Sequence, residues 1–208
     1  SASMDDARDF TLQMWICPTL PDKAVQTIIS KGNGDGYALR LEEGRLTLRL
    51  GSVAVSVDQT VRANQWYFVS AVYDSDSGRV RLALEASRGA TSGLDDRVEE
   101  AVTAEQLSSA GDVLIAAEVT ADGQVVNHYN GKVDAPKFFT RALSDEELAA
   151  LRDDDAAAPT DAAASWDFSQ GINTWSVVDA SGNGHDAELV NKPTRGVTGR
   201  NWTGQELA

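Results

Sequence analysis

The chain has 208 residues with 32 acidic and 18 basic side chains, a formal net charge of −14 and one cysteine. The acidic excess argues against nucleic acid or an anionic membrane as a partner, because lysine and arginine hold such partners. One cysteine excludes an intrachain disulfide, and no apolar run approaches the ~18 residues of a membrane span. We therefore expect a chain that is soluble in water.

The first 140 residues predict many short antiparallel strands. Residues 1–3, Ser-Ala-Ser ahead of Met4, resemble residues left by an expression vector and are set aside. After them, apolar and polar residues alternate with period two between turns rich in Gly, Asp and Asn. The predicted strands cover residues 10–16, 27–30, 37–41, 45–50, 66–73 and 79–84.

The next part of the chain adds a polar segment, more strands and one helix. Residues 88–110 are polar and acidic, which favours a surface loop or a short helical insertion. Residues 113–117 and 131–139 predict strands again. Ser144 is followed three residues later by Glu147, the spacing of a capping box, so a helix of two to three turns is expected to begin there.

Residues 152–164 have the composition of a connector, being rich in Asp and Ala and containing Pro159. Only residues 165–208 follow it. A segment that short cannot bury a stable core of its own without disulfides or metal. We therefore expect residues 165–208 to complete the core of the preceding strands.

Several phrases in this chain resemble the laminin-G-like, concanavalin A-like jelly-roll family. They include DFTLQMWICP from residue 9, NQWYFVSAVYD from residue 64 and NGKVDAPKFFTRALSDEEL from residue 130, in the order of the family. The resemblance implies an all-β fold: a two-sheet antiparallel jelly-roll sandwich with one short helix.

The phrases that usually begin this family stand here at the other end of the chain. Residues 165–169 read SWDFS, and residues 179–186 read DASGNGHD. We therefore predict a circularly permuted strand order in a single domain, residues 4–208, with residues 165–208 as the displaced first strands. Because the termini of compact domains lie close together, such a permutation preserves the contacts. Trp166, Phe168 and Leu189 would then fill the same core.

A narrower resemblance comes from residues 189–204, LVNKPTRGVTGRNWTG, which are similar to the large-subunit family of N,N-dimethylformamidase. In that family a sandwich precedes the catalytic domain. The resemblance implies a non-catalytic accessory module of a larger, cytoplasmic, bacterial amidohydrolase. Its partners would be the catalytic domain or other subunits. The resemblance also implies an iron cofactor, which would lie in that separate catalytic domain. The alternative is a carbohydrate-binding or adhesive module with a glycan partner.

Calcium is the best cofactor candidate in the chain itself. The turn from Asp179 to Gly184 offers a carboxylate, the amide of Asn183 and backbone carbonyls, which are the oxygen ligands that calcium prefers. The family resemblance implies that Asp134 joins them. The alternative is that Asp179 and Asn183 only stabilise a tight turn through backbone hydrogen bonds.

Other candidate residues are few. Trp175 lies beside Asn173 and Thr174 in a predicted loop and is the expected sugar-stacking residue. His128 and His185 have no nucleophile motif beside them, so we expect loop positions without catalytic roles. Cys17 follows a predicted strand and is expected to be a small buried side chain.

Overall fold

The structure, a computed structural model, describes residues 8–33, 36–87, 93–103, 111–197 and 199–200. Within these ranges the regular elements are one α-helix, α1 (Asp145–Arg152), and fifteen strands. The strands are β1 (Phe10–Pro18), β2 (Val25–Lys31), β3 (Tyr37–Glu42), β4 (Arg45–Leu50), β5 (Val53–Thr60), β6 (Tyr67–Asp74), β7 (Arg79–Ala86), β8 (Asp96–Ala101), β9 (Val113–Ile115), β10 (Glu118–Val119), β11 (Val125–Val126), β12 (Gly131–Phe139), β13 (Ala164–Ser165), β14 (Ser176–Val177) and β15 (Ala187–Glu188).

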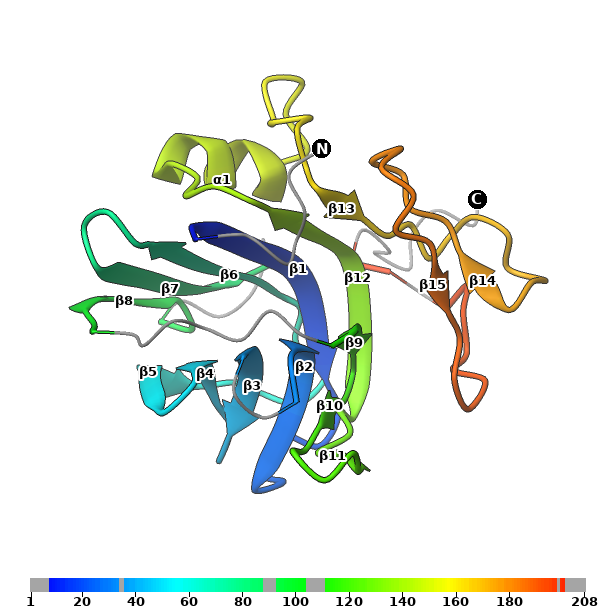
Figure 1. Cartoon of the computed structure of the whole chain (residues 1–208), viewed down its shortest axis with the longest axis horizontal. Coiled ribbons are helices and arrows are strands. Elements are labelled where there is room, and N and C mark those ends of the chain that lie inside the picture. The colour runs from blue at the N-terminus through cyan, green and yellow to red at the C-terminus, as the bar shows by residue number, and fades with distance from the viewer. Residues whose placement is uncertain (1–7, 34–35, 88–92, 104–110, 198, 201–208) are drawn as a thin grey trace.

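Two antiparallel sheets form the sandwich (Figure 1). One has the order β13-β12-β1-β6-β7-β8 and the other β5-β4-β3-β2-β9. Buried apolar side chains of both sheets belong to one core cluster, among them Phe10, Leu48 and Leu84. The expected all-β sandwich with one short helix is confirmed.

Alternation along β4 shows how sequence places a strand between core and solvent. Leu46, Leu48 and Leu50 are buried in the core, whereas Arg45 is exposed and Arg49 is half-buried. Successive side chains of a strand point to opposite faces, so a period of two covers one face of the sheet with leucine. The other face remains polar.

β6 is apolar on both faces because both are covered. Val69 and Ala71 belong to the core between the sheets, while Phe68 and Val72 belong to a second cluster on the outer face. This arrangement explains why residues 67–73 are all buried.

Helix α1 covers that outer face (Figure 1). Leu148 and Leu151 pack in the second cluster, together with Trp15. The predicted capping box is confirmed: the Ser144 side chain accepts from the Glu147 backbone, and the Glu147 side chain accepts from the Ser144 backbone. Together the cap and the apolar contacts fix the helix on the sheet.

The expectation of a loop or helical insertion over residues 88–110 is wrong for its central part. β8 pairs with β7 there, as the edge strand of the six-stranded sheet. Val98 packs against the core, while Arg97, Glu99 and Glu100 lie on the solvent side or the edge. Charged residues are common on edge strands because they prevent pairing with other chains, and here they hid the strand pattern. Residues 88–92 and 104–110 lie outside the described residues.

Residues 165–200, named here the C-terminal lobe, attach to the sandwich at β12. β13 pairs with β12, and Trp166 and Val177 are buried in the main core cluster. Phe168 and Leu189 are partly buried against it. The predicted packing of Trp166, Phe168 and Leu189 is therefore confirmed. The circular permutation stays a prediction. The segment 1–3 and residues 201–208 lie outside the described residues.

Candidate functional site

Asp179 is the most heavily hydrogen-bonded carboxylate of the C-terminal lobe and is only 5% exposed. Its Oδ1 accepts from the backbone nitrogens of Ser165 (2.9 Å) and Ser181 (3.0 Å). Its Oδ2 accepts from the Ser181 hydroxyl (2.8 Å) and the backbone nitrogen of His185 (3.0 Å). Each carboxylate oxygen thus has two donors from the protein.

Burial and hydrogen bonding act in opposite directions on Asp179. Burial alone would raise the pKa of its carboxyl, but the hydrogen bonds from Ser165, Ser181 and His185 together leave the pKa below its ordinary value. Hydrogen bonds to the charged form favour that form. Asp179 is therefore a buried, ionised group that organises the loop around it.

Asn183 fastens the same loop to the connector. Its Nδ2 donates to the carbonyl oxygens of Ala162 and Ala163, both at 3.1 Å. The Trp166 indole Nε1 donates to the His185 carbonyl oxygen at 2.7 Å, so the loop also holds the core tryptophan. These contacts favour the turn-stabilising alternative for Asp179 and Asn183.

Asp134, the third predicted calcium ligand, contacts a different group. Its Oδ2 lies 3.7 Å from the Nε of Arg200. Nη2 of Arg200 donates to both carboxylate oxygens of Asp154, at 2.8 and 2.7 Å, and its guanidinium carbon lies 4.6 Å from the centre of the Trp15 ring. The structure brings Asp179 and Asn183 together in one loop and pairs Asp134 with an arginine. Calcium at these three residues stays a prediction.

Arg195 is a second anchor of the C-terminal lobe. Its Nε donates to the Phe168 carbonyl oxygen (3.1 Å), and its Nη1 donates to those of Gly171 (3.2 Å) and Ser176 (3.0 Å). Its Nη2 donates to the Gln170 carbonyl oxygen. The arginines of the phrase PTRGVTGR thus hold the lobe together and against the sandwich, a role that the sequence analysis did not assign.

Trp175, the expected sugar-stacking residue, is exposed, with 56% of its surface accessible. The Nζ of Lys192 lies 4.9 Å from the centre of the Trp175 ring, which places an ammonium group over one face. The ring therefore has a cationic neighbour that the sequence analysis missed, because the two residues are far apart along the chain.

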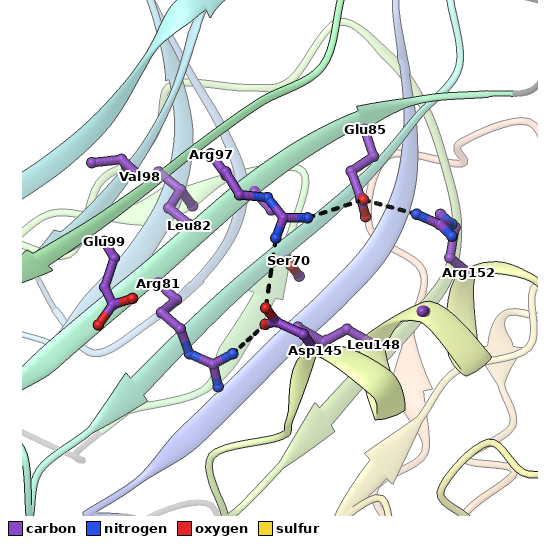
Figure 2. Close-up of a pocket in the computed structure, with 12 residues that line it drawn as sticks. Ser70, Arg81, Leu82, Glu85, Arg97, Val98, Glu99, Asp145, Leu148 and Arg152 are labelled. Carbon is purple, nitrogen blue, oxygen red and sulfur yellow. Dashed lines mark hydrogen bonds and ion pairs between the residues drawn. The ribbon is translucent and has the colours of Figure 1, made fainter.

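A pocket of about 200 Å³, which the sequence did not predict, lies between β7, β8 and α1 (Figure 2). Arg97 lies 3.5 Å from carboxylate oxygens of both Asp145 and Glu85. Arg81 pairs with Asp145, and Arg152 pairs with Glu85 at 2.8 Å. A ligand of these arginines would first have to break an ion pair, so we assign the network to holding α1 on the sheet.

The contacts of the two histidines are made by their backbone atoms, and Cys17 is buried. The His128 carbonyl oxygen accepts from Lys23 Nζ, and His185 contacts Asp179 and Trp166 through its backbone. Burial raises the pKa of the Cys17 thiol, against a smaller lowering effect of Lys132. The thiol is therefore protonated at neutral pH and weakly nucleophilic.

Comparison with protein families adds to this geometry. The model of the Laminin_G_3 family, described as the concanavalin A-like lectin/glucanases superfamily, matches residues 1–149. The chain belongs to the Laminin_G_3 family. The matched part of this Laminin_G_3 chain ends inside α1, so the connector and the C-terminal lobe lie beyond it.

Two curated relatives match nearly the whole chain. The N,N-dimethylformamidase beta subunit of Paracoccus aminophilus is 35% identical, and that of an Alcaligenes species is 34% identical. Each match covers 95% of this chain but only 29% of the relative. The chain therefore spans less than a third of the length of these relatives.

Solved structures with the same fold are more distant in sequence. A candidate carbohydrate-binding protein from Bacteroides ovatus is 15% identical with a TM-score of 0.63, covering 90% of this chain and 55% of that one. A SAP-like pentraxin from Limulus polyphemus is 19% identical with a TM-score of 0.55, covering 74% and 73%. At these identities the similarity establishes the sandwich fold alone.

Two features are absent from the described residues. None of the helices there is both long and apolar enough to span a membrane. Across the same residues, no three His, Cys, Asp or Glu side chains are grouped as a metal site would require.

Proposed function

We propose that this chain is a non-catalytic β-sandwich module of a larger amidohydrolase of the N,N-dimethylformamidase type. The observation that carries the proposal is the match to the two beta subunits, which covers 95% of this chain at 35% and 34% identity. The match extends through most of the C-terminal lobe, where the family model does not reach. A match of this extent ties the chain to those enzymes more closely than its fold does.

The remaining parts of the proposal concern the parent enzyme. Since the chain covers 29% of their length, most of each relative lies outside the matched part, and we assign the chemistry to that remainder. Its iron would be held there, so no residue of this chain is assigned to the metal. The partners are the catalytic domain or another subunit, and the location is the cytoplasm.

The test compares the 208-residue chain with the full-length protein encoded by its gene. We expect the full-length protein to hydrolyse N,N-dimethylformamide and the 208-residue chain to release no dimethylamine from it. Reading the gene beyond the codon for Ala208 is the companion observation, since the proposal requires a hydrolase domain there. Hydrolysis by the 208-residue chain alone, or a cell-wall anchor in place of that domain, would overturn the proposal.

A carbohydrate-binding or adhesive module is the second candidate, favoured by the exposure of Trp175. Aromatic rings bind sugars by stacking, and 56% of this side chain is accessible. Under this candidate the chain binds a glycan on an array, and Trp175→Ala loses that binding without a change in Tm. Equal signals from the variant and the unmodified chain would reject Trp175 as the sugar-binding residue.

A further inference from the structure

The C-terminal lobe carries most of the exposed large apolar side chains among the described residues. The described residues include seven exposed large apolar side chains, and five of the seven lie between residues 172 and 197. Those five, named here the lobe surface, are Ile172 (53%), Trp175 (56%), Val178 (40%), Val190 (73%) and Val197 (48%). Single exposed apolar residues are common, but a concentration of them indicates an interaction site.

Contacts within the lobe relate four of these residues in two pairs. A Cβ on Gly196 would lie 3.3 Å from Cδ1 of Ile172, so Ile172 lies beside the backbone next to Val197. The backbone nitrogen of Leu189 donates to the Trp175 carbonyl oxygen at 2.8 Å, which places Val190 near Trp175. The lobe surface thus comes from three separate stretches of chain, and these contacts place residues of different stretches near each other in two pairs.

The lobe is also held rigidly while it projects from the sandwich. Among the described residues, β14 and β15 pair with each other in a two-stranded sheet, which lies beyond β12 at the side of the molecule (Figure 1). Arg195 donates hydrogen bonds to four backbone carbonyls of the lobe, and the Asp179 carboxylate accepts four. A rigid apolar surface loses little conformational entropy when it docks.

Charge distinguishes the lobe from the rest of the chain. Residues 165–200 contain four acidic and three basic side chains, whereas the whole chain has a net charge of −14. Elsewhere a second copy of the chain or any acidic protein would be repelled. Docking at the nearly neutral lobe avoids most of this repulsion.

The comparisons indicate which partner the surface serves. The Laminin_G_3 model stops at residue 149, before the lobe, whereas the matches to the beta subunits cover 95% of the chain. The matches to the enzyme relatives therefore reach into the lobe, where the Laminin_G_3 model does not. More than two thirds of each relative lies outside the match. That remainder is a partner covalently linked to the sandwich.

We infer that the lobe surface docks onto the part of the parent amidohydrolase polypeptide that lies outside this sandwich. The inference rests on the proposed function and names the face through which the module contacts its enzyme. The partner surface it fits is apolar and carries few acidic groups. Val190 and Trp175 are its two most exposed members.

The test compares amide hydrogen exchange in the 208-residue chain and in the full-length protein. We expect peptides covering residues 172–178 and 189–197 to exchange more slowly in the full-length protein than in the 208-residue chain. Val190→Asp should remove that protection and lower the Tm of the full-length protein. The matched control is Val125→Asp, a change at a valine that is 52% exposed in β11, which should leave both unchanged. In the 208-residue chain alone, neither variant should shift the Tm.

Three outcomes would overturn the inference. Equal exchange of these peptides in both proteins would show that nothing covers the lobe surface. Light scattering that finds a dimer of the 208-residue chain, dissociated by Val190→Asp, would assign the surface to a second copy. Glycan binding lost in Trp175→Ala, without protection in the full-length protein, would assign it to sugar. A full-length protein that is protected here but does not hydrolyse N,N-dimethylformamide would overturn the proposed function and leave the docking surface standing.

Discussion

Removal of residues 165–208 is expected to abolish cooperative thermal unfolding of this chain. Trp166 and Val177 are 3% and 1% exposed and belong to the same core cluster as the strands of both sheets. Replacing one buried tryptophan by alanine alone costs about 3–5 kcal/mol. Since domains of this kind are stable by only about 5–15 kcal/mol, the loss of both side chains and their neighbours should leave little or no folded population.

The truncation would also expose an edge. β13 pairs with β12 at the end of the six-stranded sheet, and without residues 165–208 only Ala164 of this strand remains. Unpaired edges recruit other chains, so we expect aggregation of residues 4–164. Circular dichroism during heating and light scattering measure the two effects. Trp166→Ala in the full chain is the milder companion and should lower the Tm while keeping the transition cooperative. An unchanged cooperative melt of residues 4–164 would contradict the predicted contribution of the lobe, and with it the circular permutation.

Sequence patterns predict this fold well where a strand has one solvent-exposed face, or where residues close together in the sequence form the contact. The alternation of Leu46, Leu48 and Leu50 with polar residues shows a half-buried strand without further information. The capping box at Ser144 likewise predicts the helix start from residues that contact each other locally. β8 was missed because an edge strand has little to bury and its charged residues resemble those of a loop.

The candidate site was less predictable because its contacts join distant residues. Nothing in the local sequence shows that Lys192 lies over Trp175, or that Arg200 lies over Trp15 and beside Asp134. A turn rich in Asp, Asn and Gly has the same composition whether it binds calcium or donates hydrogen bonds to itself. Only the positions of the donors around Asp179 favour the second alternative.

Asp179→Asn is expected to destabilise the chain by roughly 2–4 kcal/mol at pH 7, from the loss of charge-assisted hydrogen bonds to a buried group. An asparagine has one acceptor oxygen. Its amide nitrogen would face the Ser181 hydroxyl and the His185 backbone nitrogen, the two donors that Oδ2 of Asp179 now satisfies. Urea unfolding measures the change. Asp76→Asn is the matched control, because it removes the same charge from an exposed turn and should have no comparable effect.

The effect of Asp179→Asn should depend on pH in a defined direction. The pKa of the Asp179 carboxyl is lowered in the folded chain, so its ionised form is favoured by folding. Its stabilising contribution is then fully present above the unfolded pKa of about 3.9 and is lost as the pH falls through the folded value. Because asparagine does not titrate, the difference in unfolding free energy between the two chains should shrink between about pH 5 and pH 3.

A chelator separates this hydrogen-bond account from the predicted calcium site. If protein donors alone satisfy the Asp179 carboxylate, EDTA should leave the Tm of the unmodified chain unchanged, because no bound ion contributes to its stability. If calcium holds the loop, EDTA should lower the Tm, added calcium should restore it, and Asp179→Asn should remove the response. That second result would contradict the hydrogen-bond account. It would also require Asp134 to leave Arg200 if all three predicted ligands share one ion.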